Sequence, residues 1–150
     1  MIKSLVPALL ALNLALPAFA ADDHDDHDDH AEAEEMAHAF ELDGLRVIHP
    51  WIRATDDKEA LVFMEIHNAG DAPVEILGAK MDWAGAAALV GFTITGGEGS
   101  YTELPSVPVS PGRELALSPD GLAIEATDLT RAFEKGEHGD MTLLTSLGPI

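Results

Sequence analysis

Between residues 45 and 147 the chain consists of short apolar stretches that alternate with turn residues, and this pattern limits the fold more than any other feature. Stretches rich in Val, Ile, Leu and Phe end at Gly, Pro, Asn or Asp, which is typical of short strands and turns. We expect strands at 45–53, 60–67, 74–81, 86–95, 101–104, 113–117, 122–126 and 140–147, and one helical turn at 130–135. Seven or eight short strands without a long helix indicate an all-β fold, a Greek-key β-sandwich.

Turn and breaker residues add detail to this prediction. The sequence Asn-Ala-Gly-Asp at 68–71 predicts a tight turn, and the glycine-rich stretch at 96–99 predicts a hairpin loop. Pro50 lies inside the first expected strand. Because proline has no N–H to donate, we expect an edge position or a bulge there.

The first 20 residues have the features of a secretory signal peptide. Lys3 precedes an apolar run at 5–16, and the small-x-small pattern at 18–20 predicts cleavage after Ala20. The run is shorter than the roughly 20 residues of a membrane span, although a retained anchor is an alternative. No cysteine follows the run, so we expect no lipid anchor. The predicted location is the periplasm, with no membrane insertion after cleavage.

The overall charge restricts the partners of the chain. Its 27 acidic residues against 8 basic ones give a formal net charge of −19. Such a protein repels nucleic acid and anionic membrane surfaces, and it attracts cations. The chain has no cysteine, so any metal must be held by His, Met or carboxylate side chains.

Residues 21–40 form an acidic, histidine-rich segment that we interpret as metal-binding. The triplet Asp-Asp-His occurs three times from residue 22, and residues 22–35 hold nine carboxylates, three imidazoles and no basic side chain. Like charges oppose packing, so we expect a disordered extension that a divalent cation can order. The candidate metal ligands are His24, His27, His30, His38, Asp23, Asp26, Asp29 and Met36.

The ligand types indicate which metals fit the segment. Imidazole and carboxylate together favour Zn²⁺ or Cu²⁺ over Cu⁺, whereas Met36 and His38 offer a softer pair. The spacing of three would place the histidines near one face of a helix, if one formed; flexible wrapping around the ion is the other arrangement. The alternative to metal binding is a solvated acidic tail with incidental histidines.

Elsewhere the chain offers few chemical groups in a recognisable pattern. His49 and His67 are single histidines that we interpret as structural, while the loop at 137–141 brings a carboxylate, an imidazole and a thioether together. The chain has no cysteine nucleophile, no Gly-x-Ser-x-Gly motif and no phosphate-binding loop. We therefore expect that the protein is not an enzyme.

Several motifs resemble one known family, the PCu(A)C copper chaperones. They are Val-x-x-Pro-Trp-Ile-Arg-Ala at 47–54, Ala-Leu-Val-Phe-Met-Glu-Ile-His-Asn-Ala-Gly at 60–70, Val-Glu-Ile-Leu-Gly-Ala at 74–79 and Val-Pro-Val-Ser-Pro-Gly at 107–112. The resemblance covers most of residues 44–147. It implies a cupredoxin-like β-sandwich in the periplasm that carries copper.

The chain departs from this family at the copper ligands. The family binds Cu⁺ through a His-Met pair, a further Met and a His-x-Met pair. The resemblance places these positions near Leu89 and Val90, near Tyr101, and on Ala123 and Glu125. None of these side chains is a soft ligand for Cu⁺. The chain therefore resembles a degenerate member that lacks the His and Met ligands.

These features together predict a signal peptide at 1–20, a metal-binding segment at 21–40 and a β-sandwich domain at 41–150. Our hypothesis is a periplasmic metallochaperone that captures copper or zinc on the segment, for buffering or for delivery to a recipient metalloprotein or transporter. Copper follows from the resemblance and zinc from the ligand types. The alternative is a protein-interaction module with no metal role, whose acidic tail only increases solubility.

Overall fold

The computed structural model describes residues 39–150, which form eleven strands and no helix. A membrane-spanning helix is therefore also absent from this part of the chain. The strands are β1 (Ala39–Leu42), β2 (Leu45–Ile52), β3 (Glu59–Asn68), β4 (Val74–Met81), β5 (Ala86–Thr95), β6 (Glu98–Glu103), β7 (Val107–Val109), β8 (Arg113–Leu117), β9 (Leu122–Thr127), β10 (Met141–Thr145) and β11 (Gly148–Pro149).

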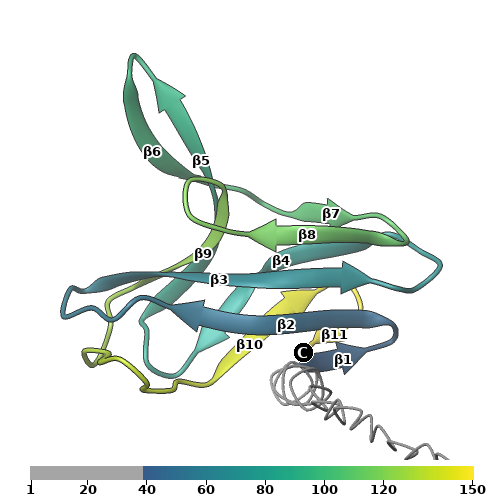
Figure 1. Ribbon diagram of the computed structural model, residues 1–150, viewed down its shortest axis with the longest axis horizontal. Helices are drawn as coiled ribbons and strands as arrows, with labels where there is room; N and C mark the ends of the chain where they lie inside the picture. Colours follow the sequence, from purple (N-terminus) through teal and green to yellow (C-terminus); the bar gives the residue numbers. More distant parts are fainter. Residues whose placement is uncertain (1–38) are drawn as a thin grey trace, which may run out of the picture.

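The strands form two sheets that pack as the layers of a sandwich (Figure 1). The larger sheet has the order β1-β2-β3-β8-β9-β5-β6, and the smaller one has the order β11-β10-β4-β7. Strand β3 pairs with β9 through residues 59–62 and with β8 through residues 64–68, so it joins both halves of the larger sheet. The predicted all-β sandwich is confirmed.

The main core fills the space between the two sheets. Alternate residues of β3, including Val62, Met64 and Ile66, are buried there against Ile76 of β4 and Leu143 of β10. Full burial of one such side chain contributes about 1.5–3 kcal/mol. The two-residue period of β3 therefore fixes which of its faces meets the smaller sheet.

A tight turn adds one strand that the sequence did not lead us to expect. Leu42 and Leu45 are paired across Asp43 and Gly44, whose φ angles are 50° and 82°. A two-residue turn with positive φ at both positions is the type I′ geometry that Asp-Gly favours. The sandwich thus begins with β1 at Ala39, two residues before the boundary that we placed at 41.

The expected irregularity at Pro50 is confirmed as a bulge. The pairing of β2 with β3 shifts register between Ile48 and Trp51, and His49 has a φ of 48°. On the other side of β2, pairing with β1 ends at Ile48. Pro50 therefore lies beyond the β1 ladder, where its missing N–H breaks no strand pairing.

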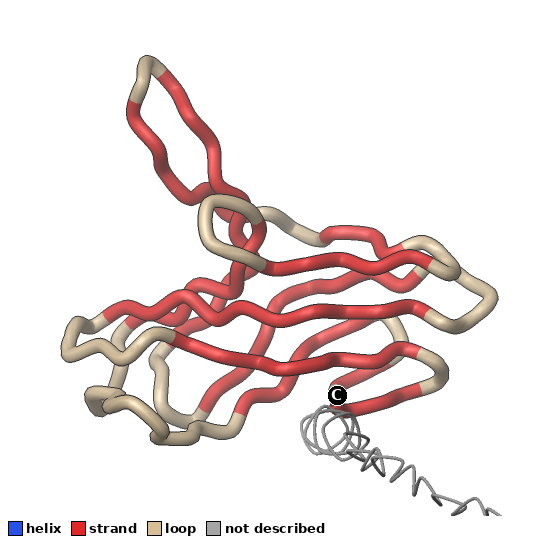
Figure 2. The backbone as a smooth tube through the Cα atoms, in the orientation of Figure 1, coloured by secondary structure: helices blue, strands red, loops and turns tan. Residues whose placement is uncertain are grey.

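Two other expectations need correction: the start of one strand and the helical turn. The loop Gly96-Gly97 closes a β-hairpin as expected, but β6 begins at Glu98 rather than at Tyr101. This hairpin projects from the body of the sandwich, as Figures 1 and 2 show. The helical turn predicted at 130–135 is wrong: Phe133 instead bridges Thr55, with backbone hydrogen bonds of 2.9 Å in both directions.

Replacement of Asn68 by alanine is expected to destabilise the sandwich by about 1–3 kcal/mol, because it leaves the buried carbonyl group of Val109 and the partly buried one of Ala72 without their donor. Asn68 is 1% exposed, and its Nδ2 donates to the carbonyl oxygens of Ala72 and Val109, both at 2.8 Å. Urea unfolding measures the change. The exposed control Thr95→Ala is expected to stay within about 0.5 kcal/mol of the parent; equal stability of both variants would contradict this role of Asn68.

Candidate functional site

The metal ligands predicted in the acidic segment all lie at positions 23–38, outside the described residues. Within residues 39–150, the histidines His49, His67 and His138 lie on β2, on β3 and in the loop before β10. In that part of the chain no three His, Asp or Glu side chains lie close enough together to hold a metal ion. The metal-binding role of the segment therefore stays a prediction.

The positions that the resemblance assigns to copper ligands do come together in space. Val90 of β5 lies opposite Ala123 of β9, and Glu125 lies opposite Ala88 in the same ladder. Tyr101 packs against the same group of side chains from β6. Leu89 instead belongs to the main core, because neighbouring residues of a strand point to opposite faces.

Apart from Glu125, the positions on this face are occupied by an apolar cluster rather than by metal ligands. Phe63, Val90 and Ala123 are 2%, 1% and 0% exposed, and Leu61, Ala88 and Tyr101 pack around them. We call these six residues the outer cluster, since they lie on the face of the larger sheet away from the main core. They present hydrocarbon and one phenol where Cu⁺ needs thioether or imidazole. The outer cluster therefore packs the sheet and does not fit a copper ion.

Aromatic rings extend the outer cluster to the protein surface. The Trp51 ring lies 4.7 Å from the Phe63 ring between centroids, yet Trp51 remains 44% exposed. Beside the cluster, a cavity of about 420 Å³ is lined in part by Leu61, Phe63 and Arg53. Trp51 thus adds exposed apolar surface beside the outer cluster.

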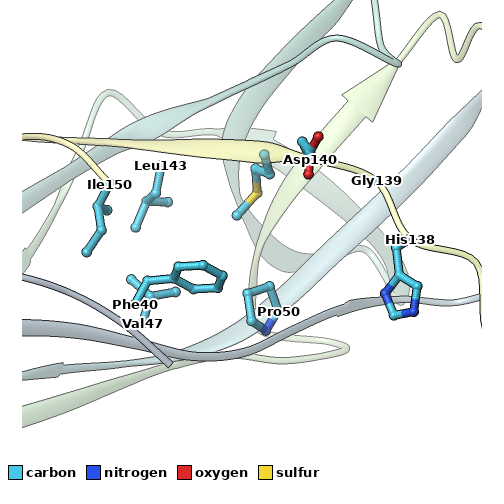
Figure 3. Close-up of a pocket in the computed structure, with 9 residues that line it drawn as sticks. Phe40, Val47, Pro50, His138, Gly139, Asp140, Leu143 and Ile150 are labelled. Carbon is cyan, nitrogen blue, oxygen red and sulfur yellow. The ribbon is translucent and has the colours of Figure 1, made fainter. Parts of the chain in front are cut away.

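A second hollow opens at the side of the sandwich, between β1 and β2 of one sheet and β10 and β11 of the other. This edge groove has a volume of about 290 Å³ and is lined by Phe40, Val47, Pro50, His138, Gly139, Asp140, Met141, Leu143 and Ile150. Figure 3 shows the apolar side chains at one end of the groove and His138 and Asp140 at the other. The groove therefore combines an apolar floor with a polar end.

Arg131 fixes the loop that carries His138. Its Nη2 donates to the carbonyl oxygen of His138 at 2.5 Å, and its Nη1 lies 3.5 Å from a carboxylate oxygen of Glu137. The guanidinium also lies 4.0 Å from the centroid of the Phe133 ring, a cation–π contact. Three contacts from one side chain hold the backbone of the loop in place.

Trp83 fixes the next two residues of that loop. Its Nε1 donates to the carbonyl oxygen of Asp140 at 2.8 Å, and its ring packs edge-on against Phe133. A Cβ atom on Gly139 would lie only 2.7 Å from Nε1 of Trp83, so the loop can approach the indole this closely only with glycine. The loop thereby holds His138 at the open edge.

Several solved structures with this architecture are PCuAC domains. The apo PCuAC domain from PmoF1 is 28% identical to the chain, with a TM-score of 0.66 over 75% of the chain and 92% of that domain. The copper-bound PCuAC domain from PmoF2 is 20% identical, with a TM-score of 0.62 over 75% of the chain and 92% of that domain. The apo PmoF2 PCuAC domain is also 20% identical, with a TM-score of 0.61 over 75% of the chain and 89% of that domain. The sandwich is thus a PCuAC-type domain.

The sequence also matches a family profile, the LpqE-like family ("Putative lipoprotein LpqE-like"), over residues 45–148. The chain belongs to this family. The resemblance to PCu(A)C proteins and the cupredoxin-like sandwich that it implied are confirmed. No curated protein matches the sequence significantly.

The sequence pointed to the 137–141 loop but not to the groove behind it. Phe40 and Ile150, at opposite ends of the described chain, meet in that groove. Phe40 reaches the groove through the pairing of β1 with β2. Ile150 reaches it through its backbone hydrogen bonds with Leu143. The Asp43-Gly44 turn signal could have predicted the first of these contacts.

A histidine placed in the outer cluster is expected to destabilise the domain, because the ligand position is now tightly packed. Ala123→His should cost about 1–3 kcal/mol, the usual cost of overpacking a core site. The matched control Glu125→His puts the same side chain two residues further along β9, where we expect a change within about 0.5 kcal/mol. Thermal and urea unfolding measure both, and an Ala123→His variant as stable as its parent would contradict the packed cluster.

Proposed function

We propose that this LpqE-like protein is an exported, non-enzymatic metal-binding protein that captures a divalent ion on residues 21–38. The captured ion is buffered or delivered to a recipient, and the sandwich supplies the surface on which that recipient docks. Delivery implies a periplasmic metalloprotein or transporter as the partner. The proposal combines the ligand chemistry of the segment with the packing of the sandwich.

The outer cluster is the observation that carries this proposal. The family resemblance assigns copper ligands to positions that converge around Val90, Tyr101 and Ala123, and these side chains pack together without a soft ligand. These positions therefore carry none of the soft copper ligands that the resemblance implies. The repeated Asp-Asp-His triplets offer the imidazoles and carboxylates that the outer cluster lacks.

Two observations support copper as the ion, and one leaves zinc as its competitor. A solved neighbour is a copper-bound PCuAC domain, and imidazole nitrogen is a good ligand for Cu²⁺. Imidazole with carboxylate suits Zn²⁺ as well. The net charge of −19 attracts either cation to the protein.

The sequence features of residues 1–20 support the periplasm as the site of action. A basic residue, an apolar run and a small-x-small pattern in that order direct secretion and cleavage. The family description, which refers to lipoproteins, agrees with an exported protein.

The second candidate function is a protein-interaction module without a metal role. Trp51 is 44% exposed beside the outer cluster, and Ile94 on the projecting hairpin is 71% exposed. These two side chains support docking of a partner, because large apolar patches on a protein surface serve interaction. In this case the acidic segment serves only solubility, and partner binding is independent of metal ions.

Loss of the three triplet histidines is expected to reduce the affinity for Cu²⁺ and Zn²⁺ at least about 10-fold, because imidazole provides the nitrogen ligands. Isothermal titration of the processed chain compares the parent with a His24→Asn, His27→Asn, His30→Asn triple variant. The matched control His67→Gln removes an imidazole from β3 and should leave both affinities unchanged.

Equal affinities in the triple variant and its parent would overturn metal capture by the segment. A partner that binds the processed chain equally well with and without a chelator, in a parent that takes up neither ion, would establish the interaction module instead.

A further inference from the structure

We propose a second metal site in this protein, selective for copper(I), formed by Met81, Met141 and His138 at the open edge of the sandwich. The site lies on the smaller sheet and in the loop before it. It is separate from the outer cluster, which lies on the larger sheet, and from residues 21–38. It therefore goes beyond the proposed capture of a divalent ion.

The strand register places the two thioethers next to each other. Met81 is the last residue of β4, Met141 is the first of β10, and the two are direct partners in the antiparallel ladder. Directly opposite residues have Cβ atoms about 4.5–5.5 Å apart and point to the same face of the sheet. Two flexible thioethers in this position can reach one ion between them.

Both methionines are accessible to a solvent-borne ion. They pack at the margin of the main core and are only partly buried, unlike Met64, which is 1% exposed. Together they line a shallow cavity with the acidic residues Asp82 and Asp140, which outnumber its one basic residue, Lys80. These carboxylates attract a cation to the thioethers.

His138 is the proposed third ligand because it lines two hollows together with Met141, which is the strand partner of Met81; Met81 itself lines neither hollow. His138 and Met141 line the edge groove and also the adjoining cavity below Trp51 and Trp83. Within residues 39–150 the His138 imidazole makes no hydrogen bond or ion pair, whereas Arg131 and Trp83 hold the backbone around it. The imidazole can therefore turn toward Met141 while its loop stays in place.

The ligand set selects the oxidation state of copper. Two thioether sulfurs and one imidazole form a soft, low-coordinate site, which suits Cu⁺ better than Zn²⁺ or Cu²⁺. The described residues hold no cluster of three His, Asp or Glu, so oxygen and nitrogen ligands alone do not build a site here. Sulfur from methionine is what makes this edge of the sandwich chemically distinct.

The test uses the full processed chain, reduced copper and two readouts. Competition with a chromophoric copper(I) chelator gives the affinity, and X-ray absorption at the copper edge reports copper–sulfur scattering. The chain has no cysteine, so any sulfur ligand must be methionine. We expect the Met81→Leu, Met141→Leu double variant to lose the sulfur signal and more than about 100-fold in affinity, beyond the usual effect of outer-shell changes. Leucine is close to methionine in volume, so folding should persist.

Three further variants separate the ligands from their surroundings. His138→Gln should weaken copper(I) binding and retain the sulfur signal. Met36→Leu and Met64→Leu change methionines outside the proposed site and should retain both the affinity and the signal. Absence of copper–sulfur scattering in the parent would overturn the proposal. So would a signal that survives the double variant, or one that disappears with Met36→Leu alone.

The same variants keep this proposal and the proposed function apart. The triple histidine variant at 24, 27 and 30 should retain copper(I) binding and its sulfur signal. Conversely, the double methionine variant should retain the parent affinity for Cu²⁺ and Zn²⁺. Either site can therefore fail its test while the other one passes.

Discussion

The placement of β3 in the middle of the larger sheet is the constraint on which the rest of the structure depends. One row of its side chains, including Val62 and Ile66, is buried against the smaller sheet, and Phe63 on the opposite row is buried in the outer cluster. Glu65 on that opposite row is exposed, so a slip by one residue would turn it toward the smaller sheet and expose Val62 and Ile66. Strand β3 therefore fixes the register of β2, β8 and β9 together, and with it the positions of both hollows.

Packing and coordination compete for the same positions in this fold. A metal site needs open coordination positions and polar side chains held apart, whereas Val90 and Ala123 are closed against Phe63. The absence of polar atoms around Val90 and Ala123 adds to the stability of the sheet. It also leaves these positions without affinity for an ion. The fold is that of PCuAC domains, and the chemistry at the place of resemblance is that of a protein interior.

The sequence predicted the elements that have strong turn signals and enough length. The ranges 74–81, 86–95 and 113–117 agree with β4, β5 and β8 to the residue. Strands β7 and β11 are three and two residues long, too short for an alternation to be visible. The sequence did indicate the His138 loop as a group of possible ligands. The pairing of Met81 with Met141 follows from the register of two strands, and these residues are 60 positions apart in the chain. No local sequence pattern predicts such a pairing.

The Asp43-Gly44 hairpin has a consequence for the acidic segment that precedes it. Because β1 folds back along β2, residue 39 is anchored at the side of the sandwich where Phe40 borders the edge groove. Covalent attachment makes an encounter between the preceding residues and that groove an intramolecular event, which raises the effective concentration of one for the other. The hairpin thereby decides which edge of the sandwich lies nearest to the point where the preceding residues join the fold.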